Sequence, residues 1–300
     1  EVTNDGAVPH ELLLVGVLPV GAWQEGTPEV SGSILAGMEY AQLAIQIEDG
    51  KIVLPEQVPA GRTLITYTNE GRESSHPFLL RVPEIVGVEQ ALADLGPEAM
   101  EPPGWFFEAT FPGFVGETLP GETSRAVVDL APGSYLVLDD AAFPFEVVEP
   151  AETPAGAQDP ESDGTVRLFE MGFGLPEAIE PGRQVLEVTN DGAVPHELLL
   201  VWSPKPVTPE QAVALFESED PDATPEGGGP SGAEIVPAGG MGWLSPGMTA
   251  WAEVDLETGY YIAVCFVFDP ETGMPHAMQG MVDVFTVVGG GTPATATPEG

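Results

Sequence analysis

The sequence predicts an all-β protein, built from two tandem Greek-key β-sandwich domains with short helices in the connections. Two observations favour this class. The 300 residues include 37 Gly and 32 Pro, which separate short runs rich in Val, Ile, Leu, Phe and Tyr. Such punctuation is typical of β-sandwiches. The same strand and turn pattern also occurs twice along the chain, and this length suits two domains.

Internal repeats define the organisation of the chain. Residues 1–15 (EVTNDGAVPHELLLV) recur identically at 187–201, and residues 54–80 form a looser copy. In these copies His10, His76 and His196 occupy one repeat position. The later part of each unit repeats as well, with Tyr135 matching Tyr261. The repeats therefore predict two complete units, which we expect to share no strands.

The composition along the chain divides it into five parts. These are an N-terminal fragment (1–40), a first domain (41–149), a linker (150–164), a second domain (165–289) and a tail (290–300). The fragment is a partial repeat, although its apolar residues 12–22 have the length of the core of a secretory signal. That run is too short to cross a bilayer, so we expect no membrane span. The linker and the tail lack large apolar residues, and the tail should be unfolded.

In the first domain, apolar and alternating runs predict the strands. They cover residues 43–47, 51–54, 63–68, 78–82, 125–130, 134–138 and 143–148. Asp49-Gly50 is a hairpin turn signal between the first two runs. Residues 88–95 are predicted to form a short helix in the connection after the fourth strand.

The second domain repeats this plan with longer loops. Its predicted strands cover residues 166–169, 184–189, 197–202, 248–256, 260–266 and 281–288. Residues 208–217 are predicted to be helical, because Thr208 is a good N-terminal cap and helical spacing of apolar residues follows it.

The charge of the chain limits its partners. Lys and Arg total 8 against 48 Asp and Glu, which gives a formal net charge of -40. Nucleic acid and anionic membrane surfaces would be repelled, whereas a partner protein with a basic patch would be attracted. A single cysteine excludes any intramolecular disulfide and leaves Cys265 free for metal or redox chemistry.

Four residues of the second domain are candidate metal ligands. Cys265, His276 and Met281 lie within residues 259–287, and His196 occupies the repeated histidine position. A thiolate, two imidazoles and a thioether are the ligand types of a mononuclear copper site. The first domain has Asp139 at the position of Cys265 and no counterpart of the following loop. We therefore expect it to bind no type 1 copper.

The second domain resembles the cupredoxins, the blue copper proteins. The resemblance rests on an Asn-x-Gly turn at Asn190 before His196, a strand that ends in Cys265, and His276 and Met281 on one loop. The Cys-x10-His spacing is longer than in small electron-transfer members, whereas His-x4-Met matches several of them and the copper domain of nitrite reductases. The resemblance implies a type 1 site, with two imidazoles and the thiolate in a plane and a long axial methionine, that cycles between Cu(II) and Cu(I).

Each candidate also has a more ordinary interpretation. Cys265 alone could be a small buried hydrophobe, and His10 and His76 should satisfy turn backbone or face solvent without binding metal. Five weaker candidates, as axial ligands or catalytic carboxylates, are Met274, Met278, Asp139, Asp269 and Glu271. The three acids are expected at the solvated surface.

The motif search favours electron transfer over catalysis. The chain has no Gly-x-Ser-x-Gly elbow, no His-Glu-x-x-His helix and no phosphate-binding glycine loop. Four isolated histidines also cannot supply the His-x-His pairs of a trinuclear copper cluster. We therefore expect an electron-transfer protein that is not an enzyme and lies outside the cytoplasm, in the periplasm or at the cell surface. The alternative is a cupredoxin-like module for copper storage, adhesion or structure.

Overall fold

A computed structural model describes residues 33–35, 39–48, 51–96, 101–139, 141–150, 158–218 and 220–289. The strands of the first half are β1 (Ala41–Glu48), β2 (Lys51–Val53), β3 (Gln57–Pro59), β4 (Gly61–Asn69), β5 (Phe78–Arg81), β6 (Val115–Glu117), β7 (Thr123–Leu130), β8 (Gly133–Leu138) and β9 (Ala142–Val148). Its helical segments are α1 (Val88–Asp94) and the 3-10 turn η3 (Phe106–Glu108).

The second half repeats this order without a counterpart of β3. Its strands are β10 (Gly164–Phe169), β11 (Gly172–Gly174), β12 (Gly182–Asn190), β13 (His196–Ser203), β14 (Val236–Leu244), β15 (Thr249–Leu256), β16 (Gly259–Val264) and β17 (Val282–Val287). Its helical segments are α2 (Pro209–Phe216) and the 3-10 turns η4 (Gly232–Glu234) and η5 (His276–Gln279). The predicted all-β class is confirmed, and so are both predicted helices.

Helix α2 begins where its capping signal predicts. The Thr208 side chain accepts a hydrogen bond from the Gln211 N–H at 3.2 Å, and the Gln211 side chain accepts one from the Thr208 N–H at 3.0 Å. This reciprocal pair satisfies two backbone donors that a helix start leaves free.

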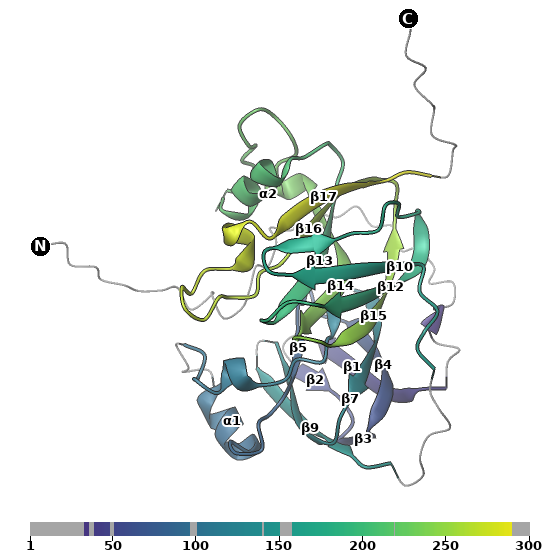
Figure 1. The fold of residues 1–300 in the computed structure, drawn as a ribbon, viewed down its shortest axis with the longest axis vertical. Coiled ribbons are helices and arrows are strands. Elements are labelled where there is room, and N and C mark those ends of the chain that lie inside the picture. The colour runs from purple at the N-terminus through teal and green to yellow at the C-terminus, as the bar shows by residue number, and fades with distance from the viewer. Residues whose placement is uncertain are drawn as a thin grey trace, which may run out of the picture.

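The strands form three sheets, two of which contain strands from both halves (Figure 1). An eight-stranded sheet has the order β11-β10-β12-β15-β7-β4-β1-β2, and a five-stranded sheet has the order β17-β16-β13-β14-β6. The remaining sheet, of order β3-β9-β8-β5, belongs to the first half. In Figure 1 the second half lies above the first along the long axis of the molecule.

Each described strand belongs to one half, but strands of the two halves pair directly within shared sheets. Strand β7 pairs antiparallel with β15, with Val127 opposite Trp251, and β6 pairs antiparallel with β14, with Glu117 opposite Gly239. Free strand edges expose unpaired backbone groups, so pairing across the junction satisfies such groups on one edge of each of the four strands. The two halves are therefore joined by continuous sheets, as the strands of a single domain are.

Aromatic side chains continue the core across the junction. The Trp243 ring of β14 stacks on the Phe78 ring of β5, with centroids 5.0 Å apart and planes 14° apart. Phe106 and Phe111 of the first half also contact Trp243, at centroid distances of 5.8 and 5.0 Å. One cluster of buried apolar residues accordingly includes members of both halves.

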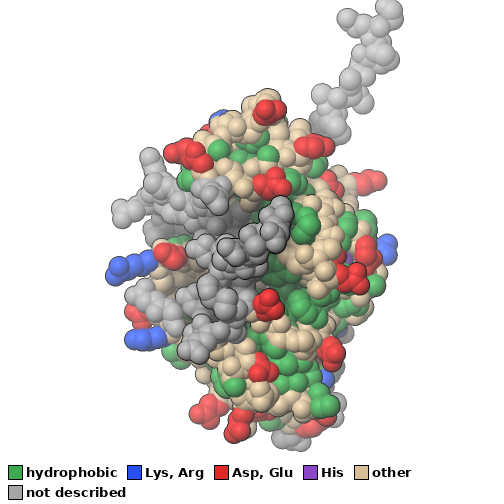
Figure 2. All heavy atoms as spheres, turned by 90° about the vertical axis from the view of Figure 1, so that its left-hand side faces the viewer, with side chains coloured by type: hydrophobic (Ala, Val, Ile, Leu, Met, Phe, Trp, Pro, Cys, Tyr) green, Lys and Arg blue, Asp and Glu red, His purple; other side chains and the backbone are tan. Residues whose placement is uncertain are grey.

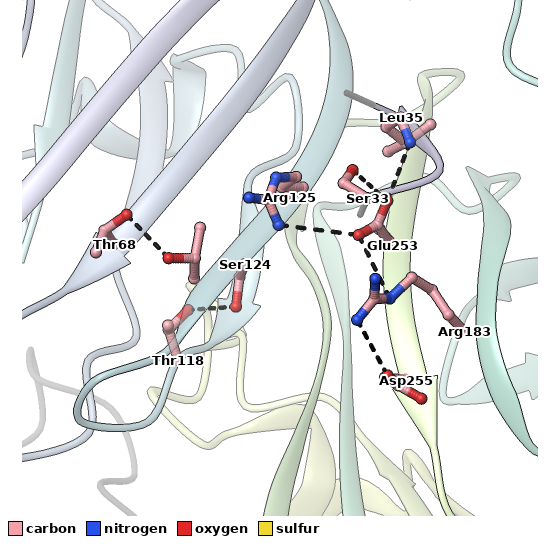
Figure 3. Close-up of polar contacts among 10 residues, drawn as sticks. Ser33, Leu35, Thr68, Thr118, Ser124, Arg125, Arg183, Glu253 and Asp255 are labelled. Atoms are coloured by element: carbon pink, nitrogen blue, oxygen red, sulfur yellow. Dashed lines mark hydrogen bonds and ion pairs between the residues drawn. The ribbon is translucent and has the colours of Figure 1, made fainter. Parts of the chain in front are cut away.

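A group of charged and polar side chains around Glu253 links the paired strands β7 and β15 (Figure 3). The carboxylate of Glu253 accepts hydrogen bonds from the Ser33 hydroxyl at 2.6 Å and the Leu35 N–H at 3.0 Å. Its other oxygen lies 3.9 Å from nitrogen atoms of both Arg125 and Arg183. Arginines from both halves thus share one carboxylate, which fixes the segment at residues 33–35 to the junction.

The surface is acidic over the face shown in Figure 2, where Asp and Glu side chains are scattered and few Lys or Arg side chains are visible. Within the described residues, no helix has both the length and the apolar character that crossing a membrane requires.

Candidate metal centre

Three of the predicted ligands converge at one end of the second half. The Nδ1 atoms of His196 and His276 lie 3.1 Å apart. The Cys265 Sγ lies 3.9 Å from Nδ1 of His196 and 3.5 Å from Nδ1 of His276. All three donor atoms lie within 4.8 Å of one another, and all three residues are buried.

Strand pairing brings His196 and Cys265 together. Strands β13 and β16 are antiparallel neighbours, with Leu199 opposite Val264, so the start of β13 lies beside the end of β16. Residues 268–274 then turn back, and His276 returns to the strand end through its N–H, which donates to the Val267 carbonyl at 2.9 Å. The long Cys-x10-His loop therefore still returns its histidine to the cysteine.

The turn before His196 is held by Asn190. Its Oδ1 accepts the Gly192 N–H at 2.8 Å, and its Nδ2 donates to the Leu244 carbonyl at 2.7 Å. A Cβ at Gly192 would lie 3.0 Å from Nε2 of His196, so a larger residue would push against the imidazole. Asn69 makes the same kinds of bond in the first half, as its repeat position predicts.

Met281 lies beside the site, and its assignment as axial ligand stays a prediction. It is fully buried in the same cluster as Cys265, and its carbonyl accepts the Cys265 N–H at 3.3 Å. Its rivals are placed differently, because Met274 is 45% exposed and Met278 packs against a separate cluster. Of the three methionines, Met281 has the placement that best suits the axial role.

The electrostatics keep both imidazoles in the form that can bind a metal. Burial, with a smaller contribution from His276, lowers the pKa of His196 to about 4. Burial also lowers the pKa of His276. Burial and the Glu197 carboxylate raise the pKa of the Cys265 thiol well above its ordinary value. The thiol would therefore release its proton only when a cation takes its place.

Sequence reasoning missed Glu197, the residue after His196. It is fully buried, its N–H donates to the Cys265 Sγ at 3.5 Å, and its Oε1 accepts the Phe266 N–H at 2.7 Å. Its Oε2 lies 3.3 Å from Nε2 of His76 in the first half. The one available signal was an acidic residue inside an otherwise apolar strand.

The expectation for His76 needs correction, because its side chain is only 7% exposed and faces Glu197 rather than solvent or turn backbone. Asp139 is half-buried rather than at the surface, and it accepts a hydrogen bond from Ser75 at 3.2 Å. Asp269 and Glu271 lie together on the loop after Cys265, where Glu271 is exposed. His10 lies outside the described residues.

The residues present fit copper. A thiolate sulfur is a soft ligand, imidazole nitrogen suits copper, and two Nδ1 atoms with one Sγ make the trigonal donor set of blue-copper sites. The backbone N–H of Glu197 supports the sulfur, as neighbours of metal ligands commonly do. The described residues contain no other group of His, Cys, Asp or Glu with metal-ligand spacing.

No protein-family model matches the sequence, and a search of curated proteins found no match. Solved structures do match. Reduced auracyanin from Roseiflexus castenholzii is 17% identical, with coverage of 41% of this chain and 94% of that chain and a TM-score of 0.25. The copper nitrite reductase of Nitrosomonas europaea is 13% identical. The match covers 82% of this chain and 93% of that chain, with a TM-score of 0.23. A multicopper oxidase is 11% identical. That match covers 82% of this chain and 88% of that chain, also with a TM-score of 0.23.

The expectation that the protein is not an enzyme is corrected by these matches, since they include a multicopper oxidase and a copper nitrite reductase. The predicted resemblance itself agrees with the chain's own geometry. Two β-sandwich halves repeat one strand order, and the second places His196, Cys265 and His276 together at one end. The protein thus has two β-sandwich halves and a His–Cys–His group in its second half.

Proposed function

We propose that the second half holds one copper ion as a type 1 centre and that the protein transfers single electrons through it. The observation that carries this proposal is the convergence of two Nδ1 atoms and one Sγ within 4.8 Å. When bound there, copper supplies one-electron chemistry by alternating between Cu(II) and Cu(I). The first half, with Asp139 at the position of Cys265, is assigned no copper of this type.

The chain's own residues hold and shield the centre in this proposal. His196, Cys265 and His276 are at most 1% exposed, so they exclude water from the donor atoms. The neutral imidazoles offer their Nδ1 lone pairs, and the Glu197 N–H stabilises negative charge on sulfur. Met281 would offer its thioether as a weak further ligand, which would tune the reduction potential rather than the affinity.

The acidic surface favours a partner protein with a basic patch. Opposite charges accelerate encounter, and added salt should slow electron transfer to such a partner because it screens them. An extracytoplasmic location, suggested by the apolar run at residues 12–22, is part of the same proposal.

The decisive experiment replaces Cys265 by Ser in the full chain. The unmodified protein should bind one copper per chain and show an intense thiolate-to-copper charge-transfer band. Cys265→Ser should lose this band and reversible electron transfer, because a hydroxyl is neither soft nor deprotonated at neutral pH. Met274→Leu, at an exposed methionine of the same loop, is the matched control and should keep both. An unchanged band in Cys265→Ser would refute the proposal.

A further inference from the structure

The contact between His76 and Glu197 joins the half without a cysteine to the metal centre of the other half. Nε2 of His76 lies 3.3 Å from Oε2 of Glu197, and the two side chains are 7% and 0% exposed. Both atoms lack a hydrogen-bond partner of good geometry among the described residues, so their contact is an ion-pair contact. Each group therefore depends on the other for compensation of its polarity, because an uncompensated buried charge is strongly destabilising.

Glu197 makes hydrogen bonds both to the Cys265 sulfur and to the backbone of the residue that follows it. Its backbone N–H donates to Sγ at 3.5 Å, while its carboxylate accepts the N–H of Phe266, the residue after the cysteine, at 2.7 Å. The orientation of this carboxylate therefore sets the path of the backbone that carries the thiolate. Whatever fixes Oε2 fixes Oε1 as well, since the carboxylate is rigid.

A positive charge on His76 would help it to fix the orientation of the Glu197 carboxylate. Burial acts to lower its pKa, but the carboxylates of Glu197, Glu117 and Asp139 together raise it above the ordinary value. When it is protonated, this imidazole balances one negative charge beside Cys265. Glu117 lies on β6, which pairs with β14 across the junction, and it is close enough to His76 and Glu197 to affect their electrostatics.

We propose that His76 is a positioning residue of the copper centre: from the first half it orients the Glu197 carboxylate, and thereby the Phe266 and Glu197 backbone groups that flank Cys265. This inference rests on the proposed copper function for its redox consequence. Its structural content, the control of Glu197 by His76, also holds in the metal-free chain. The repeat position that binds metal in one half would thus support the metal centre from the other.

The first test uses the metal-free full chain and measures hydrogen exchange of the Phe266 amide. In His76→Leu this amide should exchange about tenfold faster or more, because a hydrogen bond to an oriented, charged acceptor is weakened. The Gly113 amide, which donates across the junction to the Trp243 carbonyl at 3.0 Å, serves as an internal reference. Equal acceleration of both amides would mean general loosening and would overturn the proposal.

A second variant separates hydrogen bonding from charge. His76→Gln keeps a side-chain donor for Oε2, so the Phe266 amide should retain protection. The copper-loaded Gln variant should nevertheless have a lower reduction potential at neutral pH, since the positive charge that balances Glu197 is gone. Arg125→Gln removes another charge contact across the junction, 3.9 Å from Glu253, and should change neither readout.

The outcomes also separate this inference from the proposed function. If the unmodified protein takes up copper without a thiolate charge-transfer band, the proposed function fails, and the amide exchange still decides whether His76 positions Glu197. If His76→Leu keeps the Phe266 protection of the unmodified chain relative to Gly113, the positioning role is refuted. An unchanged band and potential in both His76 variants would refute it equally.

Discussion

Glu117 is a carboxylic acid in a place that does not suit a carboxylate. It is 4% exposed, and its Oε1 has no hydrogen-bond partner among the described residues. Burial raises its pKa from 4.5 to about 7, even though Ser74 and His76 act in the opposite direction. Glu117 lies close enough to His76 and Glu197 for their charges to affect its pKa.

The raised pKa of Glu117 predicts a loss of stability as pH rises. In the unfolded chain the group releases its proton near 4.5, whereas in the folded chain it holds the proton up to about 7. Stability is therefore fully present below 4.5 and declines between these values, by up to about 3 kcal/mol. Glu117→Gln cannot titrate and should lack this decline.

The measurement is urea unfolding of the metal-free chain between pH 4.5 and 8, compared with the variant. Glu84→Gln, at a side chain that is 92% exposed, should follow the unmodified protein and serves as the control. Parallel pH curves for the unmodified chain and Glu117→Gln would contradict the prediction.

At the scale of elements, strands with alternating apolar residues were predictable and glycine-rich strands were not. Strand β14 reads VPAGGMGWL, which looks like a loop because Gly and Pro are rare in strands. The structure explains its glycines, since a Cβ at Gly240 would lie 1.9 Å from the Leu198 carbonyl oxygen. The need for glycine at this position comes from the neighbouring strand β13, so the sequence of β14 alone does not reveal it.

The residues of the candidate site also include some that the sequence could predict and some that it could not. The repeat identified His196 and the absence of counterparts in the first half identified Cys265 and His276, because these signals lie within the sequence. The role of Glu197 and His76 could not be predicted, since it arises only when the two halves come into contact. Pairing between the halves is decided by the fit of edges and aromatic rings, such as Phe78 on Trp243, and has no local pattern.

The pairing of β6 with β14 predicts a sensitive glycine. A Cβ at Gly116 would lie 2.5 Å from the Gly239 carbonyl carbon and 2.6 Å from the Gly240 nitrogen. Backbone atoms cannot yield as a side chain can, so Gly116→Ala should lower the free energy of unfolding by about 1–3 kcal/mol.

Denaturant unfolding measures this change. Gly104→Ala is the matched control, because no atom lies within 4 Å of its added Cβ and its backbone needs no special conformation; it should stay within about 0.5 kcal/mol of the unmodified chain. An equal effect of the two substitutions would contradict the close contact of β6 with β14.

At the scale of the whole molecule, the two halves form one structural unit. Two sheets run through the junction, one apolar cluster spans it, and Arg125 and Arg183 share Glu253 above it. A formal charge of -40 opposes compaction, and these arginines place scarce positive charge where the halves meet. A fold of this kind keeps the His76–Glu197 contact in place, because neither half can move without breaking strand pairs.

This continuity predicts that both halves unfold together. Separating them would break the β7–β15 and β6–β14 pairs and expose Trp243, which is 2% exposed, so an intermediate with one folded half should not accumulate. Native-state hydrogen exchange of the metal-free chain should therefore give the slowest amides of β4 and β12 the same opening free energy. A clearly lower value for β4 would show that the first half opens by itself, and the junction would then be a contact between two independent domains.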